Sequence, residues 1–357
     1  MTGSIKILQK KSRRSFLKLA GASSLALISP FDIKPQLQTI QSHYNMQRNT
    51  PSAIGNTPLI KLMHVPEPDS AEIWVKWEGA NPTGSMKDRM ALGMIEAAER
   101  SGKLKLGMRI VEVTGGSTGS SLAMVCGPKG YKVHFVTTDA ISIEKRRTME
   151  ALGARLEIMP SHGKGITPEL VERSIARVHE LVREGNTYWT NQFGNPANAA
   201  GYKYLGHELL EAGPVDAFVM GVGTGGCISG VGEVLKDKNR KSQPLIVAVE
   251  PAASRNLSGG PTGGHRIEGI GIGFVPETVR LDLIDEIEAV TDEEAFQTTR
   301  ELARREGLFA GISSGANVAV AMRIAKRIGK GKRVVTLLCD SGLRYLSDGE
   351  LFTTGKK

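Results

Sequence analysis

The chain has 357 residues, of which 40% are hydrophobic and 23% are charged, so it is long and apolar enough to bury the cores of two ordinary domains. Its net charge of +9 is concentrated at one end, because six lysines and arginines precede the first acidic residue, Asp32, and the remainder carries only +3. A charge of +3 on the remainder does not indicate a nucleic-acid partner. The basic run 145–147 is interpreted as the solvated face of a helix.

The cysteines and the hydropathy exclude further classes of protein. The three cysteines, Cys126, Cys227 and Cys339, are far apart and form no CxxC pair, which excludes a disulfide framework and a CxxC-type zinc site. No metal site is predicted, and Cys126 is expected to be a buried structural thiol. No apolar run is long enough to span a bilayer, so we expect no stable membrane association.

The first 45 residues resemble an export leader rather than part of the fold. Residues 12–18 read Ser-Arg-Arg-Ser-Phe-Leu-Lys and precede a modest apolar run, 19–28, as in a twin-arginine signal. Residues 1–45 are therefore predicted to be disordered or cleaved, and the protein to be periplasmic. The alternatives are an ordinary basic leader and a translation start near Met46, which would leave the protein in the cytoplasm.

From about residue 50 onward, short runs rich in Val and Ile alternate with segments of helical periodicity. In chain order the expected elements are helix 86–101, strand 109–113, helix 117–126, strand 132–137, helix 142–152, strand 155–159, helix 168–184, helix 197–211, strand 216–221, helix 227–235, strand 245–250, helix 292–306, helix 314–328 and strand 333–338. Several strands show little alternation, as parallel strands covered on both faces do.

This alternation predicts an α/β fold. We expect two three-layer α/β domains with mostly parallel sheets. The smaller domain would span residues 81–190, and the larger one would combine 50–80 with 191–350. In such folds ligands bind beyond the carboxyl ends of the strands, so the cleft between the domains is the expected site.

A glycine-rich turn follows the strand 216–221. Residues 221–227 read Gly-Val-Gly-Thr-Gly-Gly-Cys and lead into a helix, so backbone N–H groups and the helix N-terminus together favour a phosphate. The turn is not a P-loop, because no Gly-Lys-Ser/Thr follows it. A purely structural turn is the alternative interpretation.

A lysine lies just inside another helix. Residues 81–89 read Asn-Pro-Thr-Gly-Ser-Met-Lys-Asp-Arg, which places Lys87 beside a helix N-terminus. By default such a lysine is a solvated residue. The positive end of the helix disfavours its ammonium form, however, and an amine that deprotonates easily can form an imine with an aldehyde cofactor.

Residues 81–89 resemble the cofactor-lysine motif of the cysteine synthase and cystathionine β-synthase family, the fold-type-II enzymes that depend on pyridoxal 5′-phosphate (PLP). Further similar motifs follow in the family's order over residues 50–350. They are 54–59 (Ile-Gly-Asn-Thr-Pro-Leu), 192–198 (Gln-Phe-Gly-Asn-Pro-Ala-Asn), 223–226 (Gly-Thr-Gly-Gly), 268–276 (Glu-Gly-Ile-Gly-Ile-Gly-Phe-Val-Pro), 311–315 (Gly-Ile-Ser-Ser-Gly) and 340–347 (Asp-Ser-Gly-Leu-Arg-Tyr-Leu-Ser).

The resemblance implies PLP in the cleft and a role for each matched residue. Lys87 would bind the cofactor aldehyde and act as the catalytic base. Ser341 would face the pyridine nitrogen, with Asp340 as the rival for that place. The full cofactor set would be Lys87, Asn56, Ser117, Gly223, Thr224, Gly225, Gly226, Cys227 and Ser341. The substrate set would be Thr114, Gly115, Gly116, Ser117, Thr118, Gln192 and Gly271, where the loop before the helix 117–126 holds the substrate carboxylate.

The chain also departs from the family's pattern. The family's carboxylate loop reads Thr-Ser-Gly-Asn-Thr-Gly, whereas Gly115 stands here for the serine and Ser117 for the asparagine. Cys227 replaces a threonine and Leu343 a glutamate. Cys227 is interpreted as a tolerated small residue, with a sulfur-handling role as the alternative. These changes leave the cofactor assignment intact and bear on the substrate.

The expected reaction is β-replacement on an activated L-serine: O-acetylserine and sulfide give L-cysteine and acetate. The alternatives are cystathionine β-synthase-like chemistry with a thiol, β-elimination from serine or cysteine as in an ammonia-lyase or desulfhydrase, and a non-catalytic PLP-binding scaffold. The partners implied are an amino-acid substrate and sulfide or a thiol. A homodimer is implied by the resemblance alone.

Overall fold

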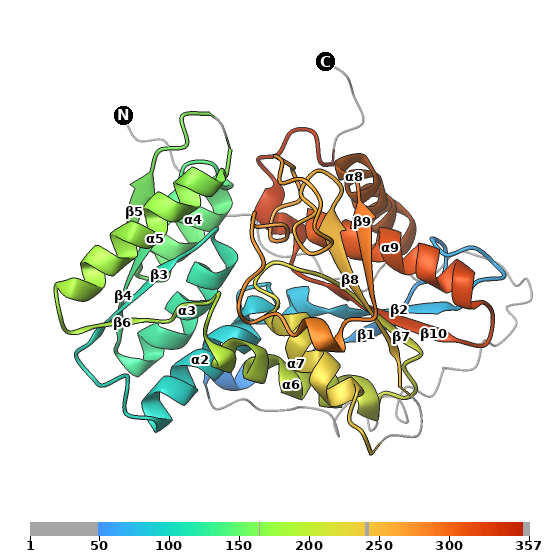
Figure 1. Cartoon of the computed structure of the whole chain (residues 1–357), viewed down its shortest axis with the longest axis horizontal. Coiled ribbons are helices and arrows are strands. Elements are labelled where there is room, and N and C mark those ends of the chain that lie inside the picture. Colours follow the sequence, from blue (N-terminus) through green and yellow to red (C-terminus); the bar gives the residue numbers. More distant parts are fainter. Residues whose placement is uncertain (1–48, 164, 240–242, 353–357) are drawn as a thin grey trace, which may run out of the picture. The chain divides into compact units, whose positions relative to one another are not determined.

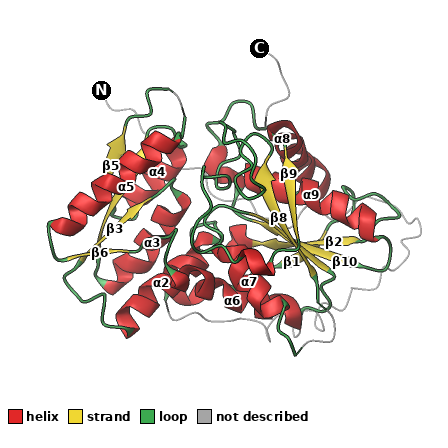
Figure 2. Cartoon of the chain, in the orientation of Figure 1, coloured by secondary structure: helices red, strands yellow, loops and turns green. Residues whose placement is uncertain are grey.

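The computed structural model describes residues 49–163, 165–239 and 243–352. The leader predicted over residues 1–45 lies outside this part of the chain. Within the described residues the helices and strands form two α/β units, each built around its own sheet (Figures 1 and 2). The α/β fold with mostly parallel strands that the sequence predicts is confirmed.

The smaller sheet is wholly parallel and has the strand order β5-β4-β3-β6. Its strands are β3 (Arg109–Val113), β4 (Lys132–Thr138), β5 (Arg155–Met159) and β6 (Thr187–Trp189). Helix α5 (Pro168–Arg183) packs its apolar side against Val111 and Val136 on one face. Helices α2 (Lys87–Arg100), α3 (Ser117–Cys126) and α4 (Ile143–Ala151) lie with the opposite face, where Ile110 and Phe135 are fully buried.

The larger sheet has the order β1-β2-β10-β7-β8-β9 and is parallel except for the pair β1–β2. Its strands are β1 (Leu59–Lys61), β2 (Glu72–Trp77), β7 (Ala217–Gly221), β8 (Leu245–Pro251), β9 (Glu286–Val290) and β10 (Arg333–Leu338). Helices α6 (Pro196–Glu211) and α7 (Gly226–Leu235) pack with one apolar cluster of the sheet. Helices α8 (Asp292–Glu301) and α9 (Ile312–Ile328) pack with the other. Three layers result.

The helix predicted over 292–306 is interrupted. It is α-helical to Glu301 and then π-helical over Leu302–Glu306, where Gly307 ends it in a left-handed conformation. Carboxylate oxygens of Glu306 accept hydrogen bonds from the backbone of Met63, His64 and Val65. These contacts tie the end of the helix to the segment between β1 and β2.

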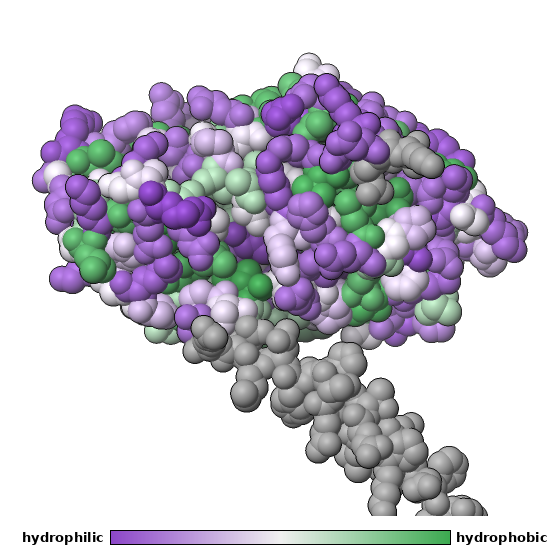
Figure 3. Space-filling view, turned by 90° about the horizontal axis from the view of Figure 1, so that it is seen from below, coloured by the Kyte–Doolittle hydropathy of each residue, from purple (hydrophilic) through white to green (hydrophobic). Residues whose placement is uncertain are grey.

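The surface carries apolar residues in separate groups. Figure 3 shows one face on which hydrophilic residues dominate and hydrophobic residues occur among them. The exposed large apolar side chains come from many different elements, for example Met63, Leu106 and Tyr204. Among the described residues, no helix is both long and apolar enough to cross a membrane.

The carboxyl ends of strands from both sheets meet one cavity of about 620 Å³. Residues directly after β3, β7 and β10 line it, together with the start of α2 and the loop 262–273. This is where a doubly wound sheet places its ligand.

Candidate active site

Lys87 is the first residue of α2, and its side chain lines the cavity. It is partly buried, and no hydrogen bond or ion pair of its side-chain nitrogen is found within the described residues. Its surroundings are otherwise densely hydrogen-bonded. A partly buried lysine without a carboxylate partner has its amine available for chemistry in the cavity.

The segment before Lys87 is held by backbone hydrogen bonds from the larger unit. Met86 N donates to Cys339 O at 2.8 Å, and Ser341 N donates to Gly84 O at 3.0 Å. A short antiparallel bridge joins Ser85 to Asp340. The start of α2 is therefore attached to the end of β10.

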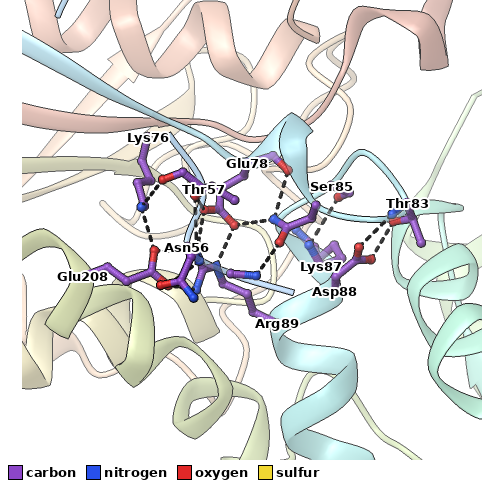
Figure 4. A network of polar contacts seen from close by, with 12 residues as sticks. Asn56, Thr57, Lys76, Glu78, Thr83, Ser85, Lys87, Asp88, Arg89 and Glu208 are labelled. Carbon is purple, nitrogen blue, oxygen red and sulfur yellow. Dashed lines mark hydrogen bonds and ion pairs between the residues drawn. The ribbon is translucent and has the colours of Figure 1, made fainter. Parts of the chain in front are cut away.

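A buried ion-pair network fixes the same helix from the other side (Figure 4). Arg89, 3% exposed, lies two residues after Lys87 and forms ion pairs with Glu78 at 2.7 Å and with Glu208 at 2.7 Å. Lys76 pairs with Glu208 at 2.6 Å and donates to Thr57 O at 2.5 Å. Two cations and two carboxylates balance each other in this network. It connects α2 to β2 and α6, which restricts the position of Lys87.

The turn between β7 and α7 has the form of an anion cradle. Gly225 caps α7 with φ of +81°, a conformation that favours glycine. Gly223 lies so close to Gly269 that an added Cβ would approach its carbonyl oxygen to 2.2 Å. The first N–H groups of α7 have no intrahelical acceptor, and the hydroxyl of Thr224 lies beside Gly226 N at 3.4 Å. A phosphate fits this set of donors.

A second anion site lies at the end of β3. Thr114 Oγ1 accepts hydrogen bonds from Gly116 N and Gly119 N, both at 3.0 Å, which shapes the turn into α3. Thr118 Oγ1 donates to Gln192 Oε1 at 2.8 Å. Ser117 N and Thr118 N stand in the first turn of α3, where no intrahelical acceptor exists, so they are available to a carboxylate.

The cavity therefore combines a lysine amine that has no partner among the described residues, a turn whose donors fit a phosphate and a second set of donors that fits an anion. An aldehyde that carries a phosphate fits the first two of these features. A model of the family described as "Pyridoxal-phosphate dependent enzyme" matches residues 51–340. The chain belongs to this family. It is a PLP-dependent enzyme.

Known members of the PLP family are similar over most of the chain. A cysteine synthase of Staphylococcus aureus is 45% identical over 303 residues, which are 84% of this chain and 95% of that protein. The solved structure of a cysteine synthase (OASS) from Entamoeba histolytica has a TM-score of 0.81 and 32% identity, and covers 94% of this chain and 96% of its own. An O-ureido-L-serine synthase has a TM-score of 0.80 and 34% identity, and covers 87% and 98%.

Most of the residues predicted to hold PLP or substrate line the one cavity. Three do not. Asn56 is exposed, and its N–H donates to Glu208 Oε1 at 3.0 Å, outside the cavity. Gly116 and Gly226 stand at the beginnings of α3 and α7, behind the lining residues. The residues that do line it are Lys87, Thr114, Gly115, Ser117, Thr118, Gln192, Gly223, Thr224, Gly225, Cys227 and Gly271.

The placement of Ser341 at the pyridine nitrogen needs correction. Ser341 is absent from the cavity lining, because its hydroxyl turns to accept Leu343 N at 3.3 Å and starts the 3₁₀ turn Gly342–Tyr345. Ser313 and Asp340 line the cavity instead. Asp340 Oδ2 accepts a hydrogen bond from Tyr345 Oη at 2.8 Å. Of the two residues weighed for the ring nitrogen, Asp340 therefore lines the cavity and Ser341 does not, and Ser313 adds a neutral hydroxyl to the lining.

Ser313 and Tyr202 are cavity residues to which sequence reasoning gave no role, and Lys145 is one that it wrongly placed on a solvated helix face. Ser313 belongs to the recognised motif 311–315, so a signal existed without an assignment. Tyr202 lies in the middle of α6 and carries no local motif, and its buried hydroxyl has no partner among the described residues. Lys145 is 3% exposed and forms an ion pair with Glu268 of the cleft loop.

The cysteines of the cavity are protonated thiols. Burial raises the pKa of Cys227 well above its usual range and that of Cys339 to about 12. A thiol in that state is a poor nucleophile. This favours the interpretation of Cys227 as a tolerated small residue. Cys126 is buried in the core, as expected of a structural thiol.

Proposed function

We propose that the protein is a cysteine synthase that converts O-acetyl-L-serine and sulfide into L-cysteine and acetate. The observation that carries this proposal is the joint placement of Lys87, the 223–225 cradle and the 114–118 anion site around one cavity. The similarity to the cysteine synthases of S. aureus and E. histolytica supports it. PLP supplies an electron sink for the β-elimination and for the addition of the nucleophile.

The protein's own side chains supply binding and proton transfer. Lys87 Nζ takes the proton from Cα of the amino acid, because no carboxylate in the described part of the chain is paired with it. The first N–H groups of α3, Thr118 and Gln192 hold the substrate carboxylate. Ser313 lines the same cavity, and a neutral hydroxyl beside the ring of bound PLP would limit electron withdrawal and favour β-elimination over transamination.

The test is a product assay on the PLP-loaded protein. O-acetylserine and sulfide are expected to give cysteine and acetate in equal amounts, and Lys87→Ala is expected to lose both this turnover and the imine absorbance band. Formation of pyruvate and ammonia in place of cysteine would show an eliminating enzyme. Absence of any spectral change with amino acids would show a scaffold. Retained turnover in Lys87→Ala would contradict the proposed role of the lysine.

A second candidate is β-replacement with a larger nucleophile, including cystathionine β-synthase-like transfer to a thiol. Gly115 lines the cavity, and a Cβ added there would meet no atom within 4 Å. The structural similarity to an O-ureido-L-serine synthase is compatible with a nucleophile other than sulfide. A panel of thiols and hydroxylated amines, offered with O-acetylserine, distinguishes the two by the product formed.

We further propose that the protein is a homodimer, on the basis of the family resemblance. Light scattering coupled to size-exclusion chromatography measures its mass directly. A mass near the 38.4 kDa of one chain would contradict the dimer.

We also propose export to the periplasm by a twin-arginine-type leader, which the paired Arg13 and Arg14 support. N-terminal sequencing of the protein from its native host tests this proposal. A first residue beyond the leader, in a periplasmic fraction, is expected. A cytoplasmic protein that starts near Met46 would contradict it.

A further inference from the structure

Glu112 is a fully buried carboxylate on β3 that does not line the cavity. One residue, Val113, separates it from Thr114, where the anion turn begins. Burying a charge is costly unless it is hydrogen-bonded on all sides. The contacts of Glu112 therefore show what the carboxylate holds in place.

Both oxygens of Glu112 accept hydrogen bonds. Oε2 accepts from Thr190 Oγ1 at 2.6 Å and from Gln192 N at 2.9 Å. Oε1 accepts from Val113 N at 2.9 Å and from Trp189 Nε1 at 3.2 Å. A carboxylate is an acceptor only, and four donors match its ionised form. The side chain thus joins the end of β3 to the chain that leaves β6.

The contacts continue from Glu112 to the cavity through Gln192. Besides the bond from its N–H to Glu112, Gln192 donates from Nε2 to Val113 O at 2.6 Å and accepts Thr118 Oγ1 at its Oε1. Its carbonyl accepts Asn198 Nδ2 at 2.7 Å. The backbone and side chain of Gln192 are therefore both fixed, and Glu112 provides the acceptor for its N–H.

The charge on Glu112 is not explained by stability. Burial is the largest influence on this carboxyl and raises its pKa to about 7, although the four donors oppose the shift. A neutral side chain of the same shape would avoid the cost of desolvation, and buried ionic groups are often replaced without loss of stability. The feature that the carboxylate does supply is the position of Gln192 against Thr118.

We propose that Glu112 is a positioning residue for the substrate carboxylate: it holds Gln192 in register with the 114–118 anion turn, and so sets the affinity for amino acids. This rests on the proposed function only in that the cavity binds an amino acid. In Glu112→Gln the new amide retains the volume, and Thr190 can turn its hydroxyl to accept from it. If the new amide nitrogen takes the place of Oε2, Gln192 N–H loses its acceptor. If it takes the place of Oε1, the N–H groups of Val113 and Trp189 lose theirs.

The experiment compares two ligands that differ in the carboxylate alone, L-serine and ethanolamine, by titration of the cofactor absorbance of the PLP-loaded protein. Glu112→Gln is expected to weaken L-serine binding about tenfold, the effect of roughly one lost charge-assisted hydrogen bond. Ethanolamine binding and PLP content are expected to be unchanged. Glu184→Gln is the matched control, because Glu184 binds the opposite end of β3 through Arg109 at 2.8 Å. It should leave both ligands unaffected.

Equal weakening of both ligands in Glu112→Gln would overturn the proposal, since it would indicate general damage to the site. Unchanged L-serine binding would overturn it as well, and so would a wild-type protein that does not prefer L-serine to ethanolamine. None of these measurements needs sulfide or product formation. A protein that fails to make cysteine, yet shows the expected ligand discrimination, would refute the proposed reaction and leave the role of Glu112 standing.

Discussion

Ser117 occupies the first position of α3, beside the donors that face the cavity. The asparagine usual in this family is longer and carries both a donor and an acceptor, so it reaches further towards a bound substrate. We expect Ser117→Asn to retain PLP and to shift preference towards the smaller nucleophile, with several-fold lower kcat/KM for bulky thiols than for sulfide. Competition assays with paired nucleophiles measure this ratio. An unchanged ratio would show that the substitution is neutral.

The ionisation of Glu112 gives the site a pH dependence of known sign. Because its pKa is about 7, the carboxylate that accepts Gln192 N forms as the pH rises through 7, and L-serine should bind more tightly above that pH. The free energy of unfolding changes in the opposite sense to L-serine affinity, because it falls as the pH rises. A carboxyl whose pKa is raised by folding contributes stability at low pH, and this contribution is lost as the pH rises from about 4.5 through 7.

Titration of L-serine affinity between pH 6 and 8 checks this expectation, with Glu112→Gln as the control. Among the described residues, Tyr188 of β6 interacts with Glu112 directly, and its own pKa is raised by burial. His179 of α5 packs edge-on against Trp189, with ring centroids 4.9 Å apart, and Trp189 donates a hydrogen bond to Glu112. A step in affinity that persists in Glu112→Gln would show that a group other than Glu112 titrates.

At the scale of the elements, α2 is held by ions as well as by apolar packing. Arg89→Met would leave Lys76 as the only cation in the network for two carboxylates. The side chain of Glu78 is fully buried and that of Glu208 is 7% exposed. Breaking such a network costs about 3–5 kcal/mol of unfolding free energy. Denaturant unfolding tests this, and Arg100→Met on the exposed side of the same helix is the control, with an expected loss below about 1 kcal/mol. Similar losses in both variants would contradict the importance of the network.

Sequence patterns predicted the buried elements well and the edge elements poorly. The predicted strands β3, β4, β5, β7, β8 and β10 all exist. Continuous apolar runs identify those that are covered on both faces, such as β4, β7 and β8, whereas β5 is an edge strand without full cover. The edge strands β1, β6 and β9 were missed, since they are short or largely half-exposed and lack such runs. The strand β2, although more buried, was missed as well. Its charged residues Glu72 and Lys76 interrupt the apolar run, and Lys76 is paired with Glu208, which is distant in the sequence.

The site could be predicted only as far as local motifs reach. The turns 114–119 and 223–226 are contiguous in the sequence, so their chemistry was visible there. The choice between Ser341 and Ser313 depends on which hydroxyl turns inward, and a local hydrogen bond to Leu343 N decides that in the fold. Glu112 acts through contacts to β6 that lie about 80 residues away along the chain, which no local pattern reveals.

At the scale of the whole molecule, the cavity wall combines residues from both sheets, so a bound cofactor stabilises the folded form across them. Removal of PLP with hydroxylamine is expected to lower the Tm. The corresponding loss is about 2.7 kcal/mol for a ligand held at a hundred times its Kd. Differential scanning calorimetry measures it, and pyridoxal, which lacks the phosphate, should restore less of the Tm than PLP. Equal recovery with both would contradict the phosphate role of the 223–225 turn.

The strand order of the larger sheet has a consequence for biosynthesis. The strand β10 lies in the middle of the sheet, between β2 and β7, yet it leaves the ribosome after every other strand of the described residues. Until residues 333–338 emerge, β2 and β7 have no partner between them, and the nascent chain exposes unpaired apolar edges. The smaller sheet, complete by Trp189, can fold during translation. The larger one must close after it, through contacts between segments far apart in the sequence, which makes the interval before β10 emerges the one most exposed to aggregation.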